Sequence, residues 1–315
     1  MLWGDRMLKR LELDALRADL SAVDANLRDR TDDPIGVLQF EHRKRELEAR
    51  IADLQREQAG ENAGVAIFFG GRPVIGSRGI LADFGTQAIS NFQSLIATRF
   101  AELDGPLGRR GPVPQRGQTQ LMITDVARGS VGFVLEEVRD DHQLLDTPLK
   151  EVVDEVCSFI RRIASPDEEA FQAVTEIVDD RLLGSLRAFF KLLDDSGATL
   201  RVVESDSEFS LGRENVERAR RRTDSLRLSE TEEIVRGTLY VLPDARKFEI
   251  HPVPVGEPIR GSISANTLRE LVGDGHEVRE GIVGVVQDLR VRIKEARVLD
   301  REPRKSFTLI GIGVA

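Results

Sequence analysis

The chain has 315 residues, which exceeds one ordinary domain, so we expect two or three folded units. Hydrophobic residues make up 40% and charged residues 31% of the sequence, a balance typical of a globular protein with a solvated surface. The net charge of −9 argues against sequence-blind binding of nucleic acid by the whole surface. Only a local basic patch could serve that role.

Residue usage argues against four further classes of protein. No apolar run reaches the roughly 18 residues that span a bilayer, and the charged N-terminal sequence lacks the apolar core of a signal peptide. Cys157 is the only cysteine, which excludes an internal disulfide framework and is typical of a reducing compartment. Four histidines leave little material for a zinc site. We therefore expect a cytoplasmic protein without membrane contact, metal or cofactor.

Residues 1–60 predict an antiparallel coiled-coil hairpin. Apolar residues recur at alternating spacings of three and four in two runs, on either side of a short polar break that holds Pro34. Helices joined by so short a link must lie antiparallel. The seam consists of Leu13, Leu16, Leu20, Val23, Leu27, Phe40, Leu47, Ile51 and Leu54. Such a pair buries too little apolar surface to be stable alone, so we expect it to fold onto its own chain or to bind a second copy or a partner.

Residues 61–227 predict an α/β body. The run GVAIFFGGRPVIGS predicts two strands joined by a turn at its paired glycines, followed by a helix over 86–103. A loop rich in Gly and Pro over 104–120 leads to a second hairpin. Helices are expected over 148–195, with Gly197 just past the last one. A strand and a basic helix, at 213–226, complete this body.

Residues 228–315 predict a small five-stranded β-barrel. Three expected strands, the first at EIVRGTLYVL and the last at PIRGSIS, precede a short helix at ANTLRELV. Two further strands follow, one at VREGIVGVVQDL, residues 278–289, and one that begins at RIKEARVLD and continues to SFTLIGIGV. This order resembles that of the OB-fold. The whole chain is thus expected to be α+β, with the hairpin, the body and the barrel as successive domains.

The glycines of AIFFGGRPVIGSRGI, residues 66–80, are a candidate phosphate site. A phosphate loop lies between a strand and a helix and closes with Lys and Ser or Thr. Here another strand is expected after the first glycine pair, so turns are the better interpretation.

Cys157 lies on the apolar face of a predicted helix and is expected to be a buried filler. We find no catalytic constellation and expect no enzyme.

The run RENVERARRRTDSLR is the strongest electrostatic feature of the sequence. Arg218, Arg221 and Arg222 share one face of the predicted helix. This face could contact the phosphates of a nucleic acid, or it could pair with the acidic remainder of the protein. The sequence leaves both alternatives open.

Three segments, ARGSVGFVLEE, LLGSLRAFFKLLDDSGATLRV and EEIVRGTLYVLPDARKFEI, resemble the layout of uncharacterised bacterial multi-domain proteins that end in a small β-barrel. The resemblance covers residues 120–315 and carries over no activity and no catalytic residue. By analogy it implies a subunit of a bacterial defence or stress complex. We expect a non-enzymatic scaffold that forms a homo-oligomer or docks a partner protein through its coiled coil. The alternative is a nucleic-acid-associated protein that uses the barrel and the arginine-rich helix.

Overall fold

The computed structural model describes residues 9–29, 34–56, 62–76, 78–103, 111–127, 131–137, 147–204, 207–254, 256–272, 278–279, 281–298 and 302–313. The chain is mixed α+β and divides into two compact units, each assembled from three segments. Unit 1 comprises Met1–Ile96, Gly117–Arg161 and Lys191–Val216, and unit 2 comprises Ala97–Arg116, Arg162–Phe190 and Glu217–Ala315. No helix in the described ranges combines the length and the apolar character needed to cross a membrane.

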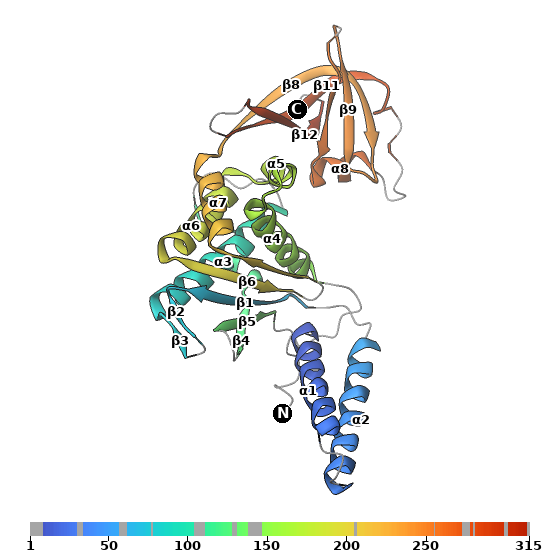
Figure 1. Cartoon of the computed structure of the whole chain (residues 1–315). Helices are drawn as coiled ribbons and strands as arrows, with labels where there is room; N and C mark the ends of the chain where they lie inside the picture. The colour runs from blue at the N-terminus through green and yellow to red at the C-terminus, as the bar shows by residue number, and fades with distance from the viewer. Residues whose placement is uncertain are drawn as a thin grey trace. The chain divides into compact units, whose positions relative to one another are not determined.

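Unit 1 begins with two long helices, α1 (Lys9–Asp29) and α2 (Pro34–Arg56). They lie side by side in Figure 1. Pro34 is the first residue of α2, where its missing N–H costs no hydrogen bond and its fixed φ suits the helix. Both helices predicted from the apolar spacing are therefore present.

A five-stranded sheet forms the body of unit 1, and its strand order is β4-β5-β1-β6-β7. The strands are β1 (Gly64–Gly71), β4 (Met122–Ala127), β5 (Gly132–Glu136), β6 (Ala198–Val203) and β7 (Glu208–Leu211). Strand β1 is central and antiparallel to both neighbours, so that Ala66 faces Val134 of β5 and Val203 of β6. Residues 64–69 are buried, which explains why this strand reads as one apolar run. Strand β7 was not predicted, because its four residues include an exposed Glu and Ser.

The predicted hairpin at Gly70–Gly71 is wrong. Both edges of β1 are already occupied by β5 and β6, so no return strand can pair with it. Instead β2 (Val74–Ile75) and β3 (Gly79–Ile80) pair with each other. Gly71 has a φ of 83° and Gly76 a φ of 52°, values that favour glycine. The glycines therefore serve turns, although the hairpin lies further along the chain than expected.

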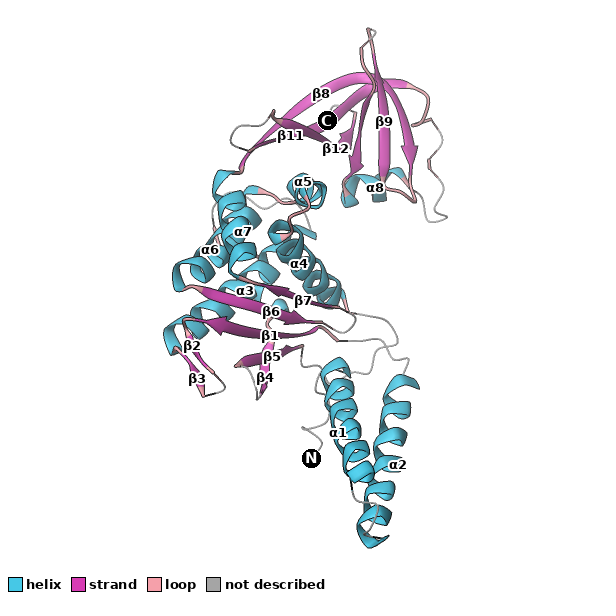
Figure 2. Ribbon diagram, viewed as in Figure 1, coloured by secondary structure: helices cyan, strands magenta, loops and turns pink. Residues whose placement is uncertain are grey.

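Within the residues that the structure describes, six further helical segments come before the barrel. They are α3 (Ala82–Leu103), the 3-10 helix η1 (Arg116–Thr119), α4 (Pro148–Ala164), α5 (Glu168–Ile177), α6 (Asp180–Ser196) and α7 (Arg213–Ser225). Figure 2 distinguishes the helices, in cyan, from the strands, in magenta. Their apolar stripes are buried, among them Phe92 of α3, Ile160 of α4 and Phe189 of α6. Gly197 follows α6 with a φ of 62°, which confirms the predicted helix end.

The C-terminal strands close into the five-stranded barrel that the sequence predicts. They are β8 (Arg227–Leu242), β9 (Lys247–Pro252), β10 (Ile259–Ile263), β11 (Val286–Arg297) and β12 (Arg304–Ile312), in the closed order β10-β12-β11-β8-β9. Helix α8 (Ala265–Leu271) follows β10. Eight residues form the barrel core: Leu239, Phe248, Ile250, Ile263, Leu271, Leu289, Val291 and Leu309. Strand β11 begins later than expected, because Gly281 and Gly284 adopt positive φ and turn the chain before it. The predicted division after Leu289 is wrong, because β11 continues to Arg297 and β12 begins only at Arg304.

Candidate functional site

The predicted seam of α1 and α2 is only partly covered. Val23 and Leu47 are buried, with 9% and 2% of their surface exposed. The side chain of Leu54 lies outside the described residues. The remaining six seam residues are intermediate in exposure: Leu13, Leu16, Leu20, Leu27, Phe40 and Ile51. Two helices therefore leave much of this apolar stripe accessible to solvent.

A charged pair interrupts the seam. Lys44 continues the apolar spacing of α2, and its Nζ donates to Oδ1 of Asp24 on α1 over 2.8 Å. The hydrogen bond and the charge of Asp24 raise the pKa of Lys44. About a third of each side chain is exposed, 37% for Lys44 and 33% for Asp24. The pair therefore links α1 to α2 at a site that water can reach.

Two of the three predicted phosphate-binding arginines cap a helix. The guanidinium of Arg218 donates to the carbonyl of Ala164 over 2.8 Å. That of Arg222 donates to the carbonyls of Ile163, over 2.8 Å, and Ser165. These carbonyls lie at the C-terminal end of α4, where the helix leaves its last acceptors unpaired and carries partial negative charge. Arg218 and Arg222 thus occupy an internal anionic site.

The surroundings of Arg222 complete this arrangement. Its guanidinium also donates to the carboxylate of Glu168 over 2.9 Å and lies 4.6 Å from the ring centre of Phe171. Only 12% of the Arg222 side chain is exposed. Arg221, by contrast, is exposed. The structure therefore separates Arg221 from Arg218 and Arg222, although the sequence places all three on one face of the helix.

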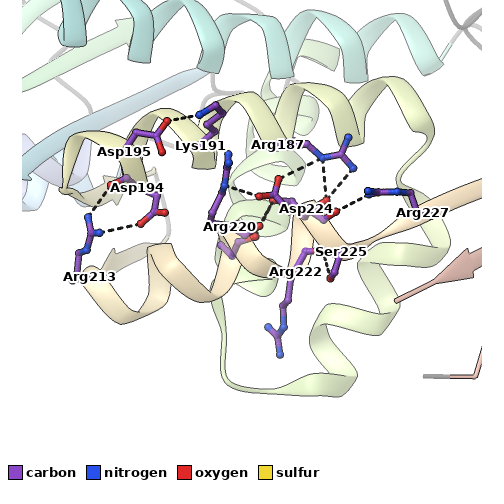
Figure 3. Close-up of polar contacts among 12 residues, drawn as sticks. Arg187, Lys191, Asp194, Asp195, Arg213, Arg220, Arg222, Asp224, Ser225 and Arg227 are labelled. Carbon is purple, nitrogen blue, oxygen red and sulfur yellow. Dashed lines mark hydrogen bonds and ion pairs between the residues drawn. The ribbon is translucent and has the colours of Figure 1, made fainter. Parts of the chain in front are cut away.

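Other basic residues of α6 and α7 also form hydrogen bonds or ion pairs, each with a polar group of its own unit. Figure 3 shows Arg187, Arg220 and Arg227 directed at Asp224, whereas Arg222 points away from it. Arg220 lies 2.7 Å from the Asp224 carboxylate, and Arg187 donates to the carbonyl of Thr223 over 3.0 Å. Within unit 1, Arg213 lies 3.1 Å from Asp194. Much of the basic run is therefore structural.

A second charged cluster has no counterpart in the sequence patterns. In unit 2, Glu102 near the end of α3, Asp179 before α6 and Lys294 of β11 lie within electrostatic range of one another. Burial raises the pKa of Glu102 to about 9, with Asp179 adding to the effect, and burial lowers the pKa of Lys294 to about 8. These residues lie far apart in the chain, and each looks like an ordinary charged residue in its local segment. No sequence signal could have joined them.

Cys157 is fully buried in α4, as expected for a filler residue. Burial raises the pKa of its thiol, and the neighbouring Glu204 raises it further. A raised pKa disfavours the thiolate that nucleophilic catalysis requires. Within the described ranges, no three His, Cys, Asp or Glu side chains are grouped so that they could hold a metal ion.

Comparison with family models, with curated proteins and with solved structures finds no match to this chain.

Proposed function

We propose that this protein is a non-enzymatic scaffold that self-assembles through α1 and α2. In this proposal two copies join their helical pairs into a four-helix bundle. The observation that carries it is the apolar seam, in which six of the eight residues with described side chains remain partly exposed. A bundle would cover this stripe, at a gain of roughly 25 cal/mol for each Å² of apolar surface removed from water.

The arrangement of the pair supports a coiled-coil hairpin. Four residues separate the end of α1 from the start of α2, so side-by-side helices must run in opposite directions. With Asp24 opposite Lys44, an antiparallel register brings Leu20 near Leu47. The apolar residues of both helices then share one face, which is the geometry that a second hairpin requires.

The charge distribution favours a second copy as the occupant. Residues 9–29 and 34–56 together contain nine basic and nine acidic residues, so the pair is neutral. The net charge of −9 therefore belongs to the rest of the chain. Two copies that approach through the neutral α1/α2 pair meet the least electrostatic repulsion.

The mass of the purified full chain, measured by light scattering after size exclusion, tests the proposal. We expect an even multiple of 35.1 kDa for the unchanged protein. The double variant Leu16→Asp/Leu20→Asp should elute as a monomer. The control Ala18→Asp/Ser21→Asp adds the same two charges at exposed positions of α1 and should keep the unchanged mass. A monomeric unchanged protein, or equal masses for both double variants, would refute self-assembly through this seam.

A second candidate function is single-stranded nucleic-acid binding by an OB-like barrel. It is supported by the closed strand order, by the parallel pairing of β10 with β12 and by the helix between the third and fourth strands. The ring of Tyr240 is exposed on β8 and lies 5.2 Å from that of His251, which provides an aromatic surface for a base. The neighbouring Arg260, however, is engaged by Glu249 over 2.8 Å.

Fluorescence anisotropy with a labelled thymidine strand of about 20 nucleotides tests this second candidate. Binding should weaken steeply between about 25 and 200 mM salt, and Tyr240→Ser should weaken it further. The control Ile234→Ser removes a similarly exposed apolar side chain from the same strand. No binding by the unchanged protein eliminates the candidate.

A further inference from the structure

The cluster of Glu102, Asp179 and Lys294 joins the barrel to the helices of unit 2. The Nζ of Lys294 donates to the carbonyls of Glu176, over 3.1 Å, and Val178. These carbonyls lie at the C-terminal end of α5, where a helix has unpaired acceptors and partial negative charge. Lys294 is 7% exposed, so water does not substitute for these contacts. One lysine of β11 thus caps α5.

The position of Glu102 requires a proton. Its Oε2 lies 2.9 Å from the guanidinium of Arg99. Its Oε1 is buried, and no group in the described part of the chain forms a hydrogen bond with it. The Asp179 carboxyl is within hydrogen-bonding reach of Glu102. Two ionised carboxylates would repel one another there, whereas a protonated Glu102 donates its O–H to Asp179.

The carboxyl group of Asp179 caps the start of α6. Its Oδ1 accepts the backbone N–H groups of Arg181, over 2.9 Å, and Leu182, over 2.7 Å. These are the first unpaired donors of α6, and the positive end of a helix favours a negative charge. The proton of the pair therefore resides on Glu102.

We propose that Glu102, Asp179 and Lys294 form a proton-linked junction that fastens β11 of the barrel to the end of α5 and loosens when Glu102 loses its proton. The junction does not depend on self-assembly through α1 and α2. The other charged groups around it are Arg99 of α3, Asp180 of α6 and Glu230, which lies opposite Lys294 on β8.

The direction of the response follows from Glu102. Burial in the junction raises its pKa from 4.5 to about 9, so each pH unit between these values favours the open form by up to about tenfold. Lys294 acts in the opposite sense above about pH 8, because burial lowers its pKa and loss of its proton relieves the desolvation of the ammonium. The junction therefore loosens mainly as the pH rises from about 5 towards 8.

Hydrogen–deuterium exchange of the full chain, measured between about pH 6 and 9.5 and corrected for the intrinsic exchange rate, tests this proposal. In the unchanged protein we expect the protection of residues 168–178 and 286–297 to fall at least tenfold between about pH 6 and 8. The protection of the central strand of unit 1, residues 64–71, should fall less, which distinguishes local opening of the junction from global unfolding.

Two variants assign the response to the cluster. Glu102→Gln keeps the shape of the protonated side chain and can donate to Asp179 at every pH, so it should remove most of the tenfold fall. Lys294→Met should lower the protection of residues 168–178 at every pH. If the unchanged protein shows no fall, or if Glu102→Gln follows the same curve, the proton-linked junction is wrong. Because Glu102→Gln is nearly isosteric, its curve decides the question even if Lys294→Met does not fold.

Discussion

Replacing Arg222 with Met tests whether the basic helix α7 is structural. The change removes a guanidinium that donates to two carbonyls at the end of α4 and to the carboxylate of Glu168. The thioether keeps most of the side-chain volume, so packing against Phe171 is largely retained. The loss is therefore mainly that of polar contacts.

The expected cost follows from those contacts. A hydrogen bond to a charged group contributes about 1.5–3 kcal/mol, and each acceptor left buried without a partner costs about 1–3 kcal/mol. Because 12% of the Arg222 side chain is exposed, water can reach part of the site and recover some of this loss. We expect Arg222→Met to lower the free energy of unfolding by about 3–5 kcal/mol.

Urea unfolding followed by far-ultraviolet circular dichroism measures this change. Arg221→Met is the matched control, since Arg221 is exposed and its replacement should change the free energy of unfolding by less than about 0.5 kcal/mol. Equal effects of the two substitutions would refute the capping role of Arg222. If Arg222→Met instead left stability unchanged and reduced nucleic-acid binding, the phosphate-binding alternative would be favoured.

Four further predictions test other parts of the structure. Gly132→Ala should destabilise the sheet by about 1–3 kcal/mol, because a Cβ there would lie 2.3 Å from the Phe68 ring. Gly184→Ala, in the open surroundings of α6, should stabilise the chain by about 0.5–1 kcal/mol in the same unfolding assay. Cys157 should resist iodoacetamide at about pH 8 in the native chain and react in about 8 M urea, as followed by mass spectrometry, since burial raises the pKa of its thiol; native labelling would contradict its burial. Glu102 binds its proton more tightly in the folded chain, so the free energy of unfolding should fall as the pH rises from about 4.5 towards 9. Between about pH 5.5 and 7.5, Glu102→Gln should reduce this fall by up to about 1.4 kcal/mol per pH unit, and parallel curves would contradict the assignment.

The elements that the sequence predicts well are those with a strong local period. The stripes of α1, α2, α4 and α6 repeat every three to four residues, and the five barrel strands are bounded by turn residues. Errors arose where a distant partner decides the outcome. Gly70–Gly71 has the local chemistry of a hairpin turn, yet β1 pairs with β5 and β6, which come from later in the chain.

The arginine site and the Glu102 cluster were also only partly predictable from the sequence. The helical spacing of the three arginines follows from the sequence of α7. The acceptors of Arg218 and Arg222 do not, because they are main-chain carbonyls of α4, and any sequence can supply a carbonyl. The proton on Glu102 is equally hidden, since it depends on Asp179 and on burial by segments that the chain supplies later.

The assembly of unit 2 from three separate chain segments has a consequence for synthesis on the ribosome. Its segments Ala97–Arg116 and Arg162–Phe190 emerge well before Glu217–Ala315, the segment that completes the unit. At about 5–20 residues per second, this last segment of roughly 100 residues takes about 5–20 s to translate. During that interval the apolar faces of α5 and of the first part of α6 lack the rest of their unit. Nascent chains halted near residue 216 should therefore bind chaperones that recognise exposed apolar segments, and release them once the barrel strands have left the ribosome.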